Sequence, residues 1–373
     1  MSAADVAVVG GGVIGLSVAY HAARRGAKVT LLEAGSLGSG ASGAAAGMLN
    51  AQAESARPGP FLDLQRAGRD AHHQLAAALC EETGLDPEYV WAGTLRVARN
   101  EGFEEKLAAE YRWQRELGLP AQWLDGATAR ELEPELAPDA RAALYLPEEG
   151  QVNPGRLVRA LALASARCGA ELREATRVTD LSVELERVIG VQTPGGSVSA
   201  DSVVLAGGAE SAALLSRLGL ELPVRPVKGE ILALQTTSPL VHANVWDEGC
   251  YLVPKRDGRV VVGATERPGE WDPRPTLDGI AELSRAGRAL VPALYTAPVV
   301  DLWGGLRPST PSGQPVLGPV AGVEGLLLAT GHHRNGILLS AITGEAISAL
   351  ALGEKPPVDI SPFRYEEHLE TAK

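Results

Sequence analysis

Three glycines and a glutamate near the N-terminus have the types and spacing of a dinucleotide site. Gly10, Gly12 and Gly15 form a Gly-x-Gly-x-x-Gly motif between an apolar run and an apolar helical stretch, and Glu33 ends the next β-type run. The glycines permit a tight turn, a close approach of the backbone to a diphosphate, and close packing of helix on strand. A diphosphate would meet the unpaired N–H groups of the helix, and Glu33 can accept hydrogen bonds from a ribose. The motif indicates a dinucleotide and leaves FAD and NAD open.

Two arginines are embedded in glycine-rich turns in the last quarter of the chain. Arg307 lies in Trp-Gly-Gly-Leu-Arg-Pro, and Arg334 lies in Gly-His-His-Arg-Asn-Gly. Arginine is suited to a planar, two-pronged grip on a carboxylate. The helix expected from Gly336 would offer free N–H groups that can stabilise negative charge on a reduced flavin ring. The sequence shows no nucleophile elbow and no metal-ligand spacing, so we expect a cofactor to perform the chemistry and no bound metal.

The elements around these residues are those of a doubly wound α/β unit. Residues 6–9 and 29–32 read as strands joined by a helix that ends at Arg24-Arg25-Gly26. Two later apolar strands, 201–209 and 325–331, end in glycines, including Gly207, as expected for close approach to a ligand at the carboxyl edge of a sheet. Adjacent histidines, His72 and His73, point in different directions on a helix expected over 61–84, so we interpret them as surface residues.

The pattern changes in two stretches that interrupt this unit. Residues 88–150 carry short segments and three of the six tryptophans, and residues 226–300 read as antiparallel strands. We therefore predict an α/β fold, a Rossmann-like dinucleotide-binding domain with an inserted antiparallel-sheet α+β substrate domain. The first domain is expected to comprise 1–85, 152–222 and 301–373, and the second 86–151 and 223–300.

A hairpin in the second domain carries an aromatic side chain that could reach a ligand. Asp257-Gly258 reads as a two-residue turn, which would place Tyr251 opposite Ala264 and Gly249 opposite Glu266. Alternation would then put one set of side chains on one face: Gly249, Tyr251, Val253, Val262, Ala264 and Glu266. Glu266 would lie either at a solvated sheet end or in a polar site beside Tyr251.

Composition limits the function classes. The net charge of −12 argues against nucleic acid or an anionic membrane as a partner. Three cysteines without a Cys-x-x-Cys motif indicate neither a disulfide framework nor a zinc site. The first apolar stretch is broken by glycines and has no basic segment before it, and no apolar span approaches 20 residues. We expect a cytoplasmic protein without a membrane span.

Over essentially its whole length the chain resembles the glycine oxidases of the D-amino-acid oxidase group of flavoproteins. Six segments carry the resemblance: Gly10–Gly15 with Glu33, Ser42-Gly-Ala-Ala-Ala-Gly-Met-Leu, Pro226-Val-Lys-Gly-Glu, Cys250-Tyr-Leu-Val-Pro, Trp303-Gly-Gly-Leu-Arg-Pro, and Thr330-Gly-His-His-Arg-Asn-Gly-Ile-Leu-Leu. The resemblance implies FAD. Flavinylated relatives carry a cysteine in the 303–308 region, and its absence here favours non-covalent binding.

The resemblance also implies roles for particular residues. Arg307 would hold a substrate carboxylate, Arg334 would line the same site, and Tyr251 would cover the substrate. The residues expected to contact FAD, with those of the fingerprint, are Gly10, Gly12, Val13, Ile14, Gly15, Glu33, Ala34, Ala41, Ser42, Ala46, Gly47, Met48, Val178, Gly207, His332, His333, Arg334, Asn335, Gly336, Ile337 and Leu338.

The implied reaction is oxidative deamination of glycine, sarcosine and small D-amino acids to a 2-oxo acid, ammonia and hydrogen peroxide, with O2 as acceptor. The alternative is a D-amino-acid or sarcosine dehydrogenase with another electron acceptor. The chain departs from the family pattern at Asn50, Gly249 and Glu266, and we expect Glu266 to face the substrate amine and alter substrate preference. A homotetramer and an association with thiamine (thiazole) synthesis are further implications of the resemblance.

Overall fold

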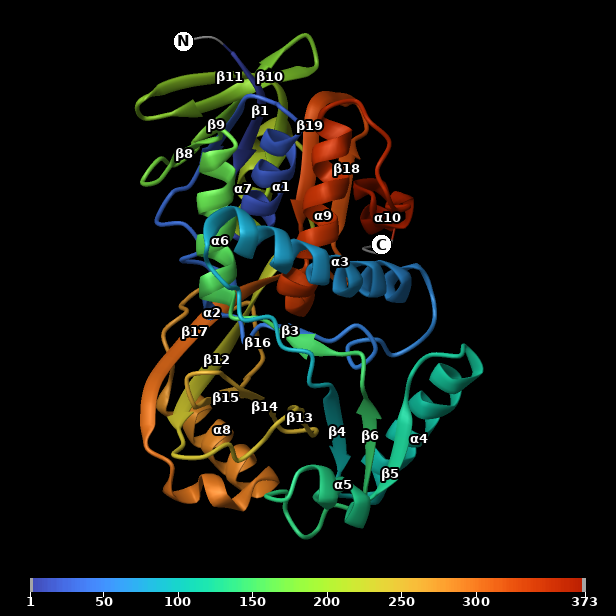
Figure 1. The fold of residues 1–373 in the computed structure, drawn as a ribbon. Helices are drawn as coiled ribbons and strands as arrows, with labels where there is room; N and C mark the ends of the chain where they lie inside the picture. The colour runs from blue at the N-terminus through green and yellow to red at the C-terminus, as the bar shows by residue number, and fades with distance from the viewer. Residues whose placement is uncertain (1–2, 371–373) are drawn as a thin grey trace.

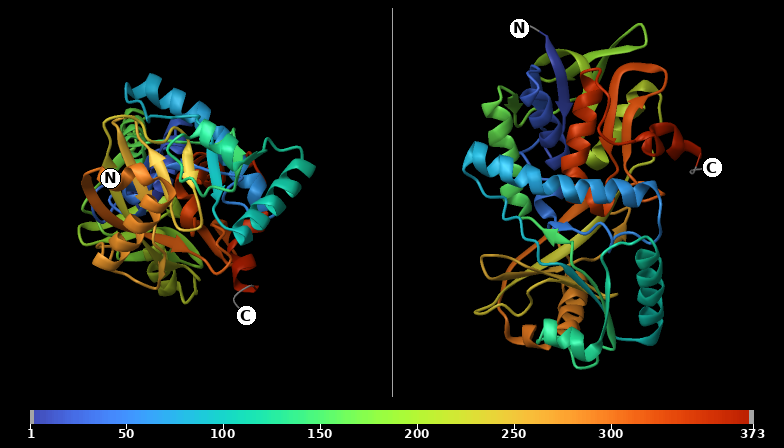
Figure 2. Two further views of the ribbon diagram at one scale, coloured as in Figure 1. Left: turned by 90° about the horizontal axis from the view of Figure 1, so that it is seen from below. Right: turned by 45° about the vertical axis from the view of Figure 1, so that its right-hand side comes forward.

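The computed structural model describes residues 3–370 and places them in two stacked units, each built on its own sheet (Figure 1). The N-terminal strand and the C-terminal helices belong to the same unit, although the chain crosses to the other unit between them (Figure 2). A two-stranded sheet, made of β3 (Met48–Leu49) and β7 (Gly150–Gln151), lies where the units meet. None of the helices in this part of the chain is long and apolar enough to cross a membrane.

The first sheet is mainly parallel at its centre, where β1 lies between β11 and β2. Its strands, in spatial order, are β18 (Val316–Val320), β19 (Val323–Thr330), β10 (Arg187–Thr193), β11 (Gly196–Leu205), β1 (Ala4–Val9), β2 (Val29–Leu32) and β8 (Glu171–Arg173), with β9 (Asp180–Glu184) on β10 and β19 also pairing with β11. Val6 and Val8 face one core and Ala7 and Val9 face the other, so β1 is buried on both sides. Burial on both faces explains the continuous apolar run of this strand.

Helices cover both faces of the first sheet. On one face α1 packs between α6 and α9, and α3 crosses α9 near the junction of the units. The helices of this unit are α1 (Val13–Arg24), α2 (Ala41–Ala44), α3 (Pro60–Thr83), α6 (Pro154–Arg167), α7 (Ser211–Leu215), α9 (Gly336–Ala351) and α10 (Tyr365–Glu370). His72, expected at the surface, is instead fully buried because α3 packs on α9 at this point. Its Nε2 atom lies 2.7 Å from the Ile337 carbonyl oxygen of α9. His73 is exposed, as expected.

The second sheet is largely antiparallel and carries the remaining helices on its sides. Its strands, in spatial order, are β16 (Arg267–Pro268), β12 (Arg225–Gln235), β15 (Arg259–Gly263), β14 (Tyr251–Pro254), β13 (Asn244–Trp246), β4 (Thr94–Ala98), β6 (Ala142–Leu146) and β5 (Gln122–Asp125), with β17 (Val299–Ser309) on the other edge of β12. The helices are α4 (Glu101–Glu116), α5 (Gly126–Leu132) and α8 (Leu277–Leu290). The α/β class and the division into a Rossmann-like and an antiparallel unit are thus as expected.

The long strand β17 places a functional segment in the second sheet. It pairs with β12 from Val299 to Ser309, whereas the expected boundary at residue 301 falls inside it. We propose that the second unit extends to Ser309, since the backbone hydrogen bonds of β17 belong to its sheet.

The predicted register of the β14–β15 hairpin is wrong by one residue. Tyr251 pairs with Gly263, not Ala264, and the turn is a three-residue loop closed between Lys255 and Arg259. Gly258 adopts a positive φ of 84°, as in a turn followed by a bulge. As a result Val262 packs on the opposite face with Leu252.

Candidate active site

The turn between β1 and α1 is so tight that it excludes side chains at two glycines. Gly10 has a φ of 108°, and a Cβ there would lie 2.5 Å from the carbonyl oxygen of Ala206 on the neighbouring strand. A Cβ on Gly15 would lie 1.9 Å from the carbonyl oxygen of Gly10. Close packing of α1 on β1 therefore requires glycine at both positions.

The carboxylate at the end of β2 is anchored to this turn. Glu33 accepts hydrogen bonds from the N–H groups of Gly11 at 2.6 Å and Gly35 at 2.7 Å. Ser42 of α2 reaches the start of α1, where its hydroxyl accepts a hydrogen bond from the N–H of Val13 at 2.9 Å. The loop after β2 is thereby held against the helix N-terminus, which is an anion-binding position.

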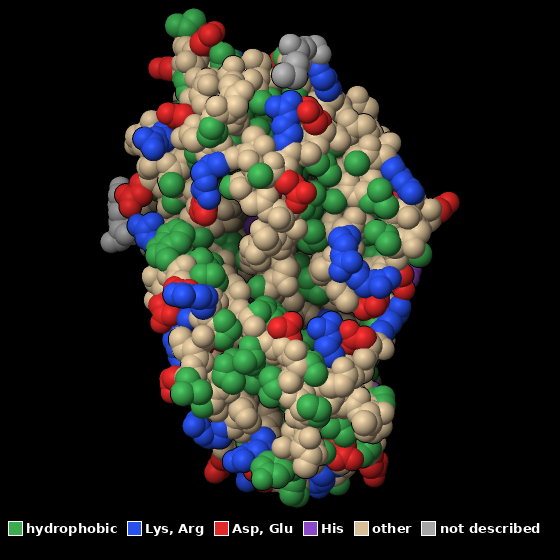
Figure 3. Space-filling view, turned by 90° about the vertical axis from the view of Figure 1, so that its left-hand side faces the viewer, with side chains coloured by type: hydrophobic (Ala, Val, Ile, Leu, Met, Phe, Trp, Pro, Cys, Tyr) green, Lys and Arg blue, Asp and Glu red, His purple; other side chains and the backbone are tan. Residues whose placement is uncertain are grey.

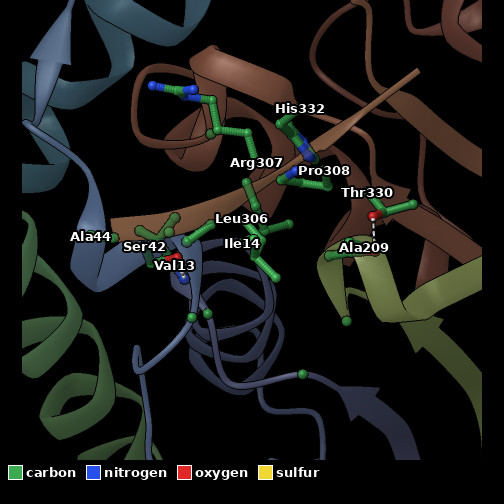
Figure 4. A pocket seen from close by; sticks show the side chains of 18 of the residues that line it. Val13, Ile14, Ser42, Ala44, Ala209, Leu306, Arg307, Pro308, Thr330 and His332 are labelled. Atoms are coloured by element: carbon green, nitrogen blue, oxygen red, sulfur yellow. Dashed lines mark hydrogen bonds between the residues drawn. The ribbon is translucent and has the colours of Figure 1, made fainter. Parts of the chain in front are cut away.

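Strand β17 closes the site from the second unit. Figure 4 shows Leu306 of β17 next to Ile14 at the beginning of α1 and Pro308 beside His332, with the Arg307 side chain pointing away from Ile14. Close contact at this junction requires small residues, because a Cβ on Gly305 would lie 2.5 Å from that of Ala44 on α2. Trp303 of β17 also donates its indole N–H to the Ala44 carbonyl at 3.0 Å.

One cavity of about 850 Å³ runs from the β1–α1 turn to β17 and the segment before α9. It is large enough for an extended cofactor together with a small ligand. Nearly all of the residues expected at the site line it: Gly10, Gly12, Val13, Ile14, Glu33, Ala34, Ala41, Ser42, Ala46, Gly47, Met48, Val178, Gly207, Tyr251, Arg307, His332, His333, Arg334, Asn335, Gly336 and Ile337.

Three expected residues do not line the cavity. Gly15 lies beneath it, packed on Gly10, and Leu338 is buried in the core of the first unit. Glu266 is exposed, and its nearest ionisable partner is His333, with 3.6 Å between carboxylate oxygen and Nε2. Gly249 lies against Ala286 of α8 and does not face the cavity either.

The structure also adds residues that sequence reasoning missed. Glu54, Asn50, Gly229 and Trp271 line the cavity near Tyr251 and Arg307. The sequence does single out Glu54, because it is the first charged residue after Glu33, at the end of a stretch of mostly small, uncharged residues. Gly229 lies in the Pro226-Val-Lys-Gly-Glu segment that carries the resemblance, but its role depends on the pairing of β12 with β17.

The two arginines differ in their partners. Arg334 contacts both carboxylate oxygens of Glu54, at 3.2 and 3.0 Å, and its guanidinium lies 5.1 Å from the centre of the Trp246 ring. Arg307 donates to the carbonyl of Thr265 at 3.1 Å and, among residues 3–370, forms no ion pair. Of these two arginines, Arg307 is thus the one whose charge is left uncompensated.

The guanidinium of Arg307 lies in a space that Gly229 leaves open. A Cβ on Gly229 would lie 2.3 Å from the Arg307 Nη2 atom. The next residue, Glu230, is fully buried and accepts a hydrogen bond from the Thr265 hydroxyl at 2.9 Å. Strand β12 therefore both makes room for Arg307 and holds Thr265, whose carbonyl accepts from Arg307.

Neutral groups complete this end of the cavity. Burial raises the pKa of the Tyr251 phenol, an effect that the nearby charges of Arg307 and Arg334 oppose. Burial lowers the pKa of His332 to about 3 and that of His333, which also faces both arginines, to about 4. Both imidazoles are therefore neutral at pH 7, and the Nδ1 of His333 lies 2.8 Å from the Ser309 hydroxyl.

A buried carboxyl holds the loop that carries Glu54. Glu149 is fully buried and accepts the N–H groups of Gln52 at 2.6 Å and Ala53 at 2.9 Å. Burial raises its pKa from 4.5 to about 7, although the hydrogen bonds from Ala53 and Gln52 favour the ionised form. The anchor of the loop thus titrates near neutral pH.

This pKa predicts a pH dependence of stability. The unfolded chain releases the Glu149 proton near pH 4.5 and the folded chain near pH 7, so the contribution to folding falls as pH rises between these values. We expect Glu149→Gln to lack this pH dependence. The difference in unfolding free energy, variant minus wild type, should therefore increase by up to about 3 kcal/mol between pH 4.5 and pH 7. Denaturant titrations at several pH values measure the difference, and a difference that does not change with pH would contradict the expectation.

Comparison with known proteins identifies the family to which this fold belongs. A family model described as DAO, FAD dependent oxidoreductase, matches residues 5–350. The chain belongs to the FAD-dependent oxidoreductases of the DAO family. The cofactor of this oxidoreductase is therefore FAD, and the residues present fit it, because Gly10 keeps the β1–α1 turn free of side chains and one cavity joins that turn to Arg307.

Several relatives of this FAD-dependent oxidoreductase match it over nearly its whole length. A glycine oxidase of Geobacillus kaustophilus is 41% identical over 98% of this chain and 97% of the relative. The crystal structure of glycine oxidase from Geobacillus kaustophilus superposes with a TM-score of 0.94, at 40% identity, and covers 98% of this chain and 99% of that one. A bifunctional protein ThiO/ThiG of Synechocystis is 37% identical over 98% of this chain and 54% of the relative.

Proposed function

We propose that this oxidoreductase deaminates glycine and small amines, such as sarcosine and small D-amino acids, to a 2-oxo acid, ammonia and hydrogen peroxide. The observation that carries the proposal is the uncompensated guanidinium of Arg307 in the same cavity as the FAD fingerprint. The names of the relatives, glycine oxidases at up to 41% identity, agree with it.

The roles of the chain's own residues follow from their positions. Arg307 binds the substrate carboxylate and so fixes the orientation of the α-carbon. Tyr251 covers the substrate from β14, because its ring lies among the residues of the cavity wall and its phenol is neutral. FAD held in this cavity would supply the acceptor for the hydride of the α-carbon and the route by which the two electrons reach O2. Water then hydrolyses the released imine.

An anaerobic screen tests the reaction class. We expect glycine, sarcosine, D-alanine or D-proline to bleach the flavin absorbance of the holoenzyme in the absence of oxygen. Under air, hydrogen peroxide should form in a one-to-one ratio with the substrate consumed. Failure of all four amines to reduce the flavin would refute the proposal, and reduction without peroxide would refute the role of O2.

Replacement of Gly229 by alanine should raise KM for glycine more than it lowers kcat. The added Cβ would occupy the space of the Arg307 guanidinium and force it to move. Because a misplacement of about 1 Å can cost roughly a hundredfold, we expect kcat/KM to fall about 10- to 100-fold. Steady-state kinetics would show this. Gly102→Ala on α4 is the control, since its nearest neighbouring atom is 3.6 Å away, and equal kinetics for both variants would contradict the expectation.

We also propose that the protein acts in the cytoplasm as a homo-oligomer, a tetramer by resemblance to its family. In support, Cys80, Cys168 and Cys250 are all free thiols. Strand β17 is the edge of its sheet within the described residues and exposes Val299 and Leu302. Figure 3 faces this side of the molecule and shows apolar side chains between charged ones in its lower half. Light scattering on the purified holoenzyme would give the number of subunits.

The association with thiamine synthesis belongs to the same proposal. The Synechocystis relative joins a chain similar to this one to ThiG in a single polypeptide, which supports it. Growth without thiamine after deletion of the gene would contradict it.

A further inference from the structure

The end of the cavity near Tyr251 holds two guanidinium groups, and one of them is already paired with a carboxylate of the chain itself. Arg334 is paired with Glu54 at 3.0 Å, whereas Arg307 has no acidic partner in residues 3–370. The side chains of Glu54 and Arg334 are 12% and 28% exposed, so solvent screens this pair less than a pair on the open surface. At this end of the cavity, Arg307, Arg334 and Glu54 together leave one positive charge, that of Arg307.

Glu54 is fixed where it stands by its neighbours in the loop. The N–H groups of Gln52 and Ala53 donate to the buried Glu149, and the Ser55 hydroxyl donates to the Ala51 carbonyl at 2.9 Å. The loop is therefore anchored on both sides of Glu54. The carboxylate itself is held by its two contacts with the Nε atom of Arg334.

Arg334 is equally constrained. Its guanidinium lies 5.1 Å from the centre of the Trp246 ring, and its backbone lies in the 3₁₀ turn His333–Asn335 that leads into α9. The other charged or titratable groups near the pair are Arg307, Tyr251, His333 and Glu266. Tyr251 and His333 are neutral at pH 7, and Glu266 is half exposed to solvent.

We propose that Glu54 determines substrate specificity, by occupying Arg334 and so restricting this site to substrates with a single carboxylate. The inference rests on the proposed function and names its substrate class. A second carboxylate would have to displace Glu54 from Arg334 or lie beside it, and like charges at such a distance repel. Without the Glu54 charge, Arg334 becomes a second anchor, suited to amines with two carboxylates such as iminodiacetate.

The test compares substrates of one and two carboxylates in the holoenzyme. We expect Glu54→Gln to raise the ratio of kcat/KM for iminodiacetate to kcat/KM for sarcosine by about 10- to 100-fold over wild type. Glu54→Asp keeps the charge and should retain the discrimination. Glu104→Gln controls for the loss of one acidic charge, because Glu104 pairs with Arg141 on the surface, and it should leave the ratio as in wild type.

A second readout needs no turnover. Malonate and acetate are non-reactive probes with two carboxylates and one, and the flavin absorbance change on binding gives their affinities. We expect Glu54→Gln to raise the affinity for malonate relative to acetate about 10-fold or more, and a further Arg334→Met change to abolish the gain. Glu54→Ala serves the same test if the glutamine variant fails to retain FAD.

The outcomes separate this inference from the function it rests on. Unchanged ratios for both iminodiacetate over sarcosine and malonate over acetate in Glu54→Gln would overturn the role of Glu54. If no amine reduces the flavin of the wild-type enzyme, the proposed function fails, and the malonate-to-acetate ratio still decides whether Glu54 restricts the second carboxylate.

Discussion

Replacement of Arg307 by alanine is expected to lower kcat/KM for glycine by about 2–5 kcal/mol in transition-state stabilisation, or roughly 30- to 5000-fold. Of the two guanidinium groups near Tyr251, Arg334 is paired with Glu54, and Arg307 has no acidic partner among residues 3–370. Its loss would leave the substrate carboxylate without its partner and the α-carbon without a fixed orientation. Steady-state kinetics on holoenzyme with equal FAD content would measure the effect.

Two comparisons show whether the loss comes from the carboxylate. Arg307→Lys keeps the charge but not the two-pronged geometry, and we expect it to recover only part of the activity. A small amine without a carboxylate should be oxidised at similarly low rates by wild type and Arg307→Ala. Unchanged kcat/KM for glycine in Arg307→Ala would rule out the proposed role.

Replacement of Gly15 by alanine is expected to disrupt FAD binding together with the fold around it. The added Cβ would lie 1.9 Å from the Gly10 carbonyl oxygen, so α1 and the β1–α1 turn must separate. We expect a loss of stability of about 1–3 kcal/mol from overpacking and a fall in FAD affinity of at least about tenfold. FAD titration of the apoprotein and thermal unfolding with and without FAD measure the two effects.

The control for this prediction is another helical glycine of the same unit. Gly155 lies in α6, where the nearest atom to an added Cβ is 3.7 Å away. Gly155→Ala should therefore keep FAD affinity and leave stability the same or raised by up to about 1 kcal/mol. Equal FAD affinity in Gly15→Ala and wild type would contradict the role assigned to this glycine.

The sequence by itself determined the dinucleotide unit. The glycines of the fingerprint, the helix and Glu33 act through contiguous backbone, so their arrangement follows from local rules that can be read without a structure. The same applies to the apolar strands of the first sheet, whose burial on both faces leaves an unbroken hydrophobic run. The family resemblance added the residues at the other end of the cavity, and nearly all of them line it.

Only the tertiary structure shows the hairpin register and the place of Glu266, because both depend on how separate segments pair. The Asp257-Gly258 pair predicts a hairpin, but the loop has three residues and not two, and a shift of one residue reverses which face each side chain occupies. Glu266 consequently does not lie opposite Gly249, and it is exposed near His333 and not in the cavity wall.

The contacts of Arg307 and Arg334 could likewise not be predicted from the sequence. Arg307 meets Gly229 and Thr265 because β17 and β12 pair side by side, and Arg334 meets Glu54 because the segment before α9 faces a loop far earlier in the chain. Charge and residue type marked both arginines as candidates for a carboxylate. Only the three-dimensional contacts show that one is compensated and the other is free, because an ion pair between remote segments leaves no local pattern in the sequence.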